Sequence, residues 1–257
     1  MSEKKSILSI IHISVKSTIL DYSFPSLLIF IILIHCLTYQ MNDFFTVNEL
    51  WGTNFTLSIY GSIVLESMVL LFYSGYLASK LFAKELEGDT IQPLFMIKSG
   101  RKVVYIGKVL SAILLMGIVT ILIFCLNYSS LMYYGTISYL TIIWIIKLSF
   151  MAFLGSLFLY LSSTVVSIIS KTVLTTMLFS SFYTIFTLFN LFMGAESIKY
   201  NLKVKSLLFL FPTVSLKYMD FCITYQGSID NILILIPLVG VISMILISYF
   251  LIKEVSI

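Results

Sequence analysis

Six long apolar runs constrain the fold of this chain more than any other feature. A helix needs roughly 20 residues to cross a hydrocarbon core of about 30 Å, and the runs approach or exceed that length. They predict membrane-spanning helices near residues 24–40, 55–79, 104–126, 138–162, 172–192 and 231–252. The sequence therefore predicts an all-α membrane protein, with one domain over residues 1–257.

The composition agrees with this class. Of the 257 residues, 59% are hydrophobic and 11% are charged, whereas soluble domains carry roughly 25% charged residues. The chain has too little polar surface to cover a globule in water. Its three cysteines have no metal-like or redox spacing, so they indicate no disulfide framework.

Two segments outside the runs are expected to lie at the membrane surfaces. In residues 5–22, Leu8, Ile11 and Val15 share one helical face and His12 and Lys16 lie opposite. This amphipathic pattern predicts a helix in the lipid interface. Within residues 193–228, the apolar piece 207–212 is too short to span, and the segment is expected to be re-entrant or to lie on the outer surface.

The basic residues predict the orientation. Residues near the span ends follow a bias that places Lys and Arg in the cytoplasm. With the N-terminus inside, eleven of the sixteen basic residues are cytoplasmic, and the first two outer loops, 41–54 and 127–137, contain none. Both termini are therefore expected to be cytoplasmic. The preference for Lys over Arg suggests a low-GC Gram-positive source, and so a bacterial cytoplasmic membrane.

The motifs of enzymes are missing from the sequence. It contains no GxxxxGK[ST], HExxH or GxSxG pattern, and only two histidines. An intramembrane hydrolase or metalloenzyme would need clustered catalytic or ligating groups. We therefore expect no catalytic residues, no metal, no cofactor bound by this chain and no nucleic-acid partner.

The stretch ELEGDTIQPLFMIKSGRK, residues 85–102, is strongly polar within an apolar chain. On the predicted topology it lies in the cytoplasm between the second and third spans. It could form a short interfacial helix that offers Leu94, Phe95 and Ile97 to a partner. It could equally be a solvated turn whose basic residues only enforce topology. The residues alone leave both interpretations open.

The spacing of this stretch matches a family signature. Glu85 and Glu87 precede Thr90, Arg101 follows eleven residues later, and Gly107-Lys108 opens the next helix. In this spacing the chain resembles the ABC-2 type transporter permeases. It departs from the family pattern at three positions, Asp89, Lys98 and Gly100.

The resemblance implies a half-transporter with an interfacial helix and six spans. Two cytoplasmic ABC ATPase subunits, which bind ATP and Mg, would drive it, and a second permease subunit, identical or a sister, would complete it. Residues 85–102 would be the coupling element, with Phe95 and its apolar neighbours as the buried anchor and Lys98, Arg101 and Lys102 at the rim. Glu85 and Glu87, at the cytoplasmic end of the second span, would pair with basic groups at the start of the third. Related permeases often export amphipathic or antimicrobial peptides or confer immunity to them. A lipid-like molecule, a drug or a polysaccharide is the alternative substrate.

Two charged residues are expected near the membrane midplane. At about 1.5 Å per residue, Glu66 and Lys147 each lie roughly 14–16 Å deep in their spans. Each charge alone would cost about 2.5–3.5 kcal/mol at a helix centre, so a shared ion pair is expected. The pair would either line the substrate path or brace the second and fourth spans. His35, on the first span, is expected to pack through hydrogen bonds.

The same two charges support a different function. An ion-coupled secondary transporter or channel could use Glu66 and Lys147 without an ATPase. No internal repeat supports that class.

Overall fold

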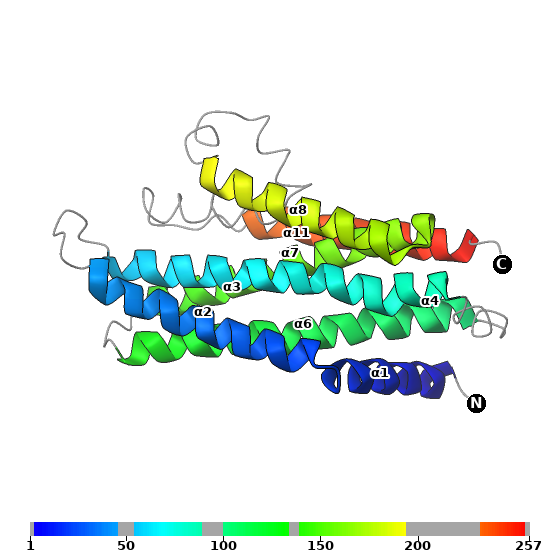
Figure 1. The fold of residues 1–257 in the computed structure, drawn as a ribbon, viewed down its shortest axis with the longest axis horizontal. Helices are drawn as coiled ribbons and strands as arrows, with labels where there is room; N and C mark the ends of the chain where they lie inside the picture. The colour runs from blue at the N-terminus through cyan, green and yellow to red at the C-terminus, as the bar shows by residue number, and fades with distance from the viewer. Residues whose placement is uncertain (1–2, 46–53, 89–99, 134–138, 194–231, 255–257) are drawn as a thin grey trace.

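The computed structural model describes residues 3–45, 54–88, 100–133, 139–193 and 232–254. Within these ranges the chain is helical and contains no strand, so the predicted all-α class is confirmed. The long helices form a bundle in which the start of α1, the end of α11 and the short helix α4 lie at the same end (Figure 1).

A helix occupies each predicted apolar run. The helices are α2 (Ser23–Phe45), α3 (Asn54–Ala78), α6 (Gly100–Tyr133), α7 (Tyr139–Ser170), α8 (Val173–Met193) and α11 (Ile232–Glu254). The π-helix η1 (Ser79–Ala83) and α4 (Lys84–Glu87) continue α3, and α1 (Glu3–Ile19) precedes α2. Residues 194–228, most of the segment expected to be re-entrant or on the outer surface, lie outside the described residues.

Three helices in the described ranges are long and apolar enough to cross a membrane. They are α6, the part of α7 from Ile145 to Ser170, and the part of α11 from Pro237 to Glu254. The number rises to four if α1 and α2, which meet at a 60° bend, are counted as one span. These helices make the chain a membrane protein, and the full set of six spans stays a prediction.

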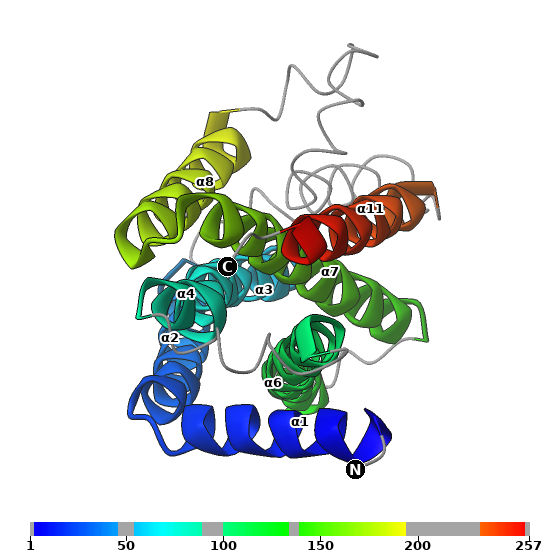
Figure 2. The same ribbon diagram turned by 90° about the vertical axis from the view of Figure 1, so that its right-hand side faces the viewer.

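Helix α7 lies at the centre of the bundle. It packs against α3, α6, α8 and α11, as the end-on view of Figure 2 shows. A sharp connection joins α7 to α8: Lys171 adopts φ 55° and the Thr172 hydroxyl donates to Thr175 Oγ1 at 2.7 Å, at the start of α8. The left-handed residue ends α7 so that α8 can turn back along the bundle.

Small polar side chains fill much of the space between the helices. The Ser111 hydroxyl donates to the Gly107 carbonyl at 2.7 Å, and the Thr164 hydroxyl donates to the Tyr160 carbonyl at 2.9 Å. Such side chains satisfy their own hydroxyls on the preceding turn and let neighbouring backbones approach closely, as is common between membrane helices.

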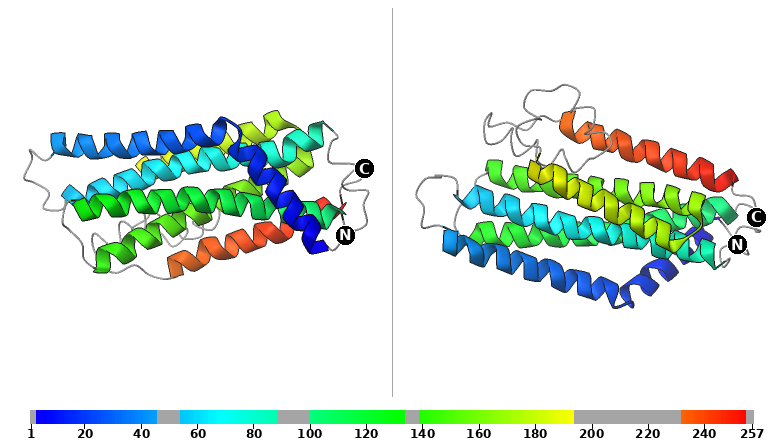
Figure 3. Two further views of the ribbon diagram at one scale, coloured as in Figure 1. Left: turned by 90° about the horizontal axis from the view of Figure 1, so that it is seen from below. Right: turned by 45° about the horizontal axis from the view of Figure 1, so that its top comes forward.

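Helix α1 crosses α6 at a steep angle (Figure 3, left). Its buried face contains Ser14 and Thr18, and Ile10 lies so close to Gly107 that a Cβ there would meet the Ile10 side chain at 2.7 Å. Of the face expected to enter the lipid, Leu8 is 64% exposed, whereas Val15 is half-buried and packs against the hydrophobic core. Helix α1 therefore packs on α6 through small residues and leaves an apolar face outward.

Candidate functional site

The end of the bundle around α4 holds a buried ion pair. Lys108 on α6 is 2% exposed, and its ammonium donates to the Glu85 carboxylate and to the Leu81 carbonyl. Its Nζ also lies 5.1 Å from the centre of the Phe82 ring. Leu81 belongs to the π-helix η1, in which backbone hydrogen bonds join residues five apart instead of four. Lys108 thus ties α6 to this turn.

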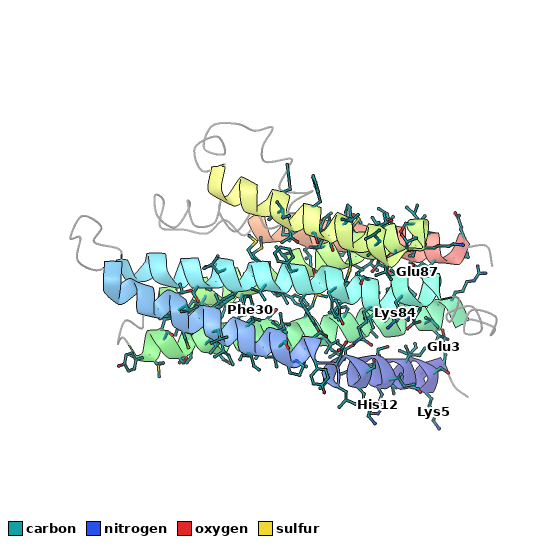
Figure 4. All side chains as sticks on the ribbon, viewed as in Figure 1. Glu3, Lys5, His12, Phe30, Lys84 and Glu87 are labelled. Atoms are coloured by element: carbon teal, nitrogen blue, oxygen red, sulfur yellow. The ribbon has the colours of Figure 1, made fainter. Side chains whose placement is uncertain are left out.

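Two further hydrogen bonds join this end of the bundle to α8 and α11. Glu87 Oε2 accepts a hydrogen bond from the Val173 backbone N–H at 3.1 Å, at the start of α8. Arg101 Nη1 donates to the Lys253 carbonyl at 2.8 Å, at the end of α11. Each charge has the sign that the adjoining helix dipole favours. Figure 4 labels Glu87 and Lys84 at this end of the bundle.

Three of the predicted coupling residues lie at this end of the bundle, each bonded to a different helix. Glu85, Glu87 and Arg101 flank residues 89–99, which lie outside the described ranges together with Thr90, Leu94, Phe95, Ile97 and Lys98. The expected pairing of Glu85 with a basic group at the start of the third span is confirmed by Lys108. The same expectation for Glu87 is wrong, because its recorded partner is the amide at the start of α8.

A second polar cluster lies within the bundle, between α2, α3 and α6. Glu66 is completely buried. Its Oε1 accepts from His35 Nδ1 at 2.7 Å and from the Ser62 hydroxyl at 2.8 Å, and its Oε2 accepts from Asn127 Nδ2 at 2.8 Å. His35 Nε2 lies 2.9 Å from Ser130 Oγ. Every polar atom of Glu66 and of the His35 ring thus has a partner in another side chain.

The expected ion pair between Glu66 and Lys147 is not formed among the described residues. Glu66 pairs instead with His35, and Lys147 is half-buried on α7. Equal depth along two spans does not fix the rotation of either helix, and the Glu66 carboxylate points toward α2 and α6. The expected hydrogen-bonded role of His35 is confirmed.

Sequence reasoning missed the neutral members of this cluster. Ser62 stands four residues before Glu66, a spacing that places both on one helical face. Asn127 and Ser130 are polar residues near the end of an apolar run. Their spacing could have indicated a buried polar face on α6, whereas nothing in the sequence indicated that this face meets Glu66.

A third ion pair holds the bend between α1 and α2. Lys80 Nζ donates to Asp21 Oδ2 at 2.6 Å, and the Tyr76 hydroxyl donates to the same oxygen at 2.9 Å. These two hydrogen bonds, Lys80's first, lower the pKa of Asp21 to about 2. The carboxylate is therefore ionised at neutral pH and connects the bend to the far end of α3.

Comparison with known proteins assigns this chain to no family. No family model matches the chain. No curated protein is significantly similar to it. The fold and its buried polar clusters define a helical membrane protein, and its function has to be argued from its own residues.

Proposed function

We propose that this chain is the permease subunit of an ATP-driven exporter, and that residues 85–102 couple it to a cytoplasmic ABC ATPase. The resemblance of that stretch to the ABC-2 permeases first suggests the function. The proposal includes six spans, both termini in the cytoplasm, a bacterial membrane, two ATPase subunits with ATP and Mg, and a second permease subunit.

The observation that carries the proposal is the attachment of both ends of residues 89–99 to four helices. On the α4 side, Glu85 bonds to Lys108 of α6 and Glu87 bonds to the start of α8. On the other side, Arg101 bonds to the end of α11. A partner that moves this segment would therefore move α3, α6, α8 and α11 together, as the coupling element of a transporter has to do.

The buried contacts next to α4 make the connection between these helices rigid. Lys108 is almost completely buried beside α4, and Tyr160 of the central helix α7 is fully buried, with its hydroxyl donating to the Lys108 carbonyl at 3.4 Å. Tyr105, one turn away, donates to the Ile245 carbonyl of α11 at 3.0 Å. Close packing of this kind passes a displacement on instead of absorbing it.

The proposed cargo is an amphipathic or antimicrobial peptide, or a toxin. The chain carries 21 Phe and 16 Tyr residues, and aromatic side chains suit a cargo with both apolar and polar faces. A lipid-like molecule or a drug is the alternative cargo.

The test is co-purification in nanodiscs with any ABC ATPase that is encoded beside this gene. Wild-type protein should retain the ATPase, and Phe95→Asp should release it, because an acid would replace the apolar anchor of the docking element. Tyr22→Asp is the matched control, since Tyr22 is 89% exposed at the bend between α1 and α2, and it should bind normally.

A second variant separates docking from coupling. Arg101→Ala removes the bond to α11, so the ATPase should still bind while substrate-stimulated ATP hydrolysis falls. If no ATPase binds the wild type, the exporter proposal fails, and an ion-coupled transporter becomes the better hypothesis.

A further inference from the structure

The buried cluster of Glu66, His35, Ser62, Asn127 and Ser130 has the geometry of a site for one exchangeable proton. Both His35 nitrogens face hydrogen-bonding groups on other helices, Nδ1 toward α3 and Nε2 toward α6. His35 is 6% exposed and Glu66 is completely buried. The site is independent of residues 85–102 and of the exporter proposal.

The Glu66 side fixes one proton on the ring. The Ser62 hydroxyl donates its hydrogen to Glu66 Oε1, so its oxygen is left as an acceptor 3.1 Å from His35 Nδ1. Nδ1 therefore carries a hydrogen, which it shares between the carboxylate and this hydroxyl oxygen. A histidine whose Nδ1 is held in this way has only Nε2 left to gain or lose a proton.

The Ser130 side accommodates both states of Nε2. A serine hydroxyl can donate or accept by rotation about its C–O bond. When Nε2 is protonated, it donates to Ser130 Oγ; when the N–H bond breaks, the electron pair stays on nitrogen and the hydroxyl turns to donate to it. The proton leaves past Ser130, which is half-buried three residues before the end of α6 at Tyr133.

The net charge of the cluster depends on the proton of His35. With a neutral His35, the Glu66 carboxylate is a net negative charge in the interior of the bundle, which is costly even when it is hydrogen-bonded. With a proton on Nε2, an imidazolium lies 2.7 Å from the carboxylate and the cluster is neutral overall. Asn127 cannot supply this compensation, because its Nδ2 donates to Glu66 as a neutral group.

The other titratable groups on the surrounding helices do not replace His35. On α2, the Tyr39 ring lies 4.6 Å from the His35 ring. Tyr128 on α6 stacks on Phe124, and α1 places no ionisable side chain on the cluster in the described contacts. Lys147 on α7 is not among the contacts of His35 or Glu66 in the described chain.

We propose that His35 Nε2 is a proton-binding site inside the helix bundle, with Glu66 as its counter-charge and Ser130 as the partner that fits both states. Release of the proton leaves a buried negative charge between α2 and its neighbours. Because His35 is the residue through which α2 enters the cluster, release weakens the docking of α2 on α3 and α6.

The chain offers a direct spectroscopic test because it contains two histidines. His12→Gln, an exposed position on α1 labelled in Figure 4, leaves His35 as the sole histidine. Protein labelled with ¹⁵N-histidine, in nanodiscs, is followed by NMR from pH 5 to pH 9. The expected result is two protonated ring nitrogens at the acid end and conversion to the Nδ1–H tautomer as the pH rises.

Two variants in the same background test the role of Glu66. Glu66→Gln should lower the ratio of imidazolium to neutral ring at pH 6 by roughly tenfold, because an opposite charge in contact with the ring is lost. Ser67→Ala is the matched control, since Ser67 is a buried residue of α3 that donates to its own helix at Ile63, and its titration should equal the parent's.

The parent titration decides the question even if Glu66→Gln does not fold. A His35 ring that keeps one protonation state at every pH where the protein is folded would overturn the proposal. So would a Glu66→Gln variant that folds and titrates like the parent, because the cluster would then be a packing contact without a coupled proton.

Discussion

Removing Glu85 and removing Lys108 from their ion pair should lower the free energy of unfolding by different amounts. The Lys108 side chain is 3% exposed, whereas that of Glu85 is 34% exposed. Removing the carboxylate therefore leaves a buried ammonium, and removing the ammonium leaves a carboxylate that water can reach. We expect Glu85→Leu to destabilise the protein more than Lys108→Met does.

The magnitudes follow from the contacts that remain. After Glu85→Leu, Lys108 keeps the Leu81 carbonyl and the Phe82 ring face, and a buried charge without its partner costs about 3–5 kcal/mol. After Lys108→Met, the methionine fills the space of the lysine stem and the Leu81 carbonyl loses a donor, which costs about 1–3 kcal/mol.

The double variant should cost about as much as Lys108→Met alone, because neither charge remains. The free energy of unfolding can be measured by SDS titration in mixed micelles, with far-UV circular dichroism as the signal. The resulting double-mutant cycle should give a coupling energy of about 3–5 kcal/mol, equal to the cost of Glu85→Leu alone. Equal costs for the two single variants, or a coupling energy near zero, would refute the reasoning from burial.

Three other predictions concern the contacts between helices. Gly107→Ala should weaken the docking of α1 on α6, because the new methyl group would meet the Ile10 side chain. Gly117→Ala, where a new methyl group would have nothing within 4 Å, should stabilise α6 by about 0.5–1 kcal/mol. Thermal unfolding of the two variants compares these effects. Tyr105→Phe should cost about 1 kcal/mol in the same assay, through the lost hydrogen bond to α11. The Asp21 carboxyl has a lowered pKa of about 2, so its contribution to stability is present at neutral pH and is lost as the pH falls from about 4 toward 2. The Asp21→Asn variant should not show this loss of stability in an acid titration. An unchanged loss in the variant would assign it to another group.

The sequence predicted where the helices lie because that information is local. A run of about 20 apolar residues is stable in a membrane only as a helix that satisfies its own backbone groups, and each of the six predicted runs coincides with a helix. The relation between Glu85 and Lys108 was also predictable. The two residues flank one connection between antiparallel helices, so they have to lie at the same end of the bundle.

The partner of Glu66 could not be found in this way. Its depth follows from a rise of about 1.5 Å per residue, and by that measure Lys147 was a reasonable partner. The direction in which its carboxylate points depends on how each helix is rotated about its axis. Those rotations are set by side-chain packing between residues as far apart as His35 and Ser130.

The sequence by itself determined that this chain is a helical membrane protein with one polar stretch between two apolar runs, because hydrophobic length and charge position act locally along the chain. The tertiary structure alone decided which polar groups meet: Glu66 with His35, Glu87 with the start of α8, and Arg101 with the end of α11. The physical reason is that an unpaired polar group costs free energy when it is buried, but this cost does not determine which partner the group finds. Only the packed arrangement of the helices selects those partners.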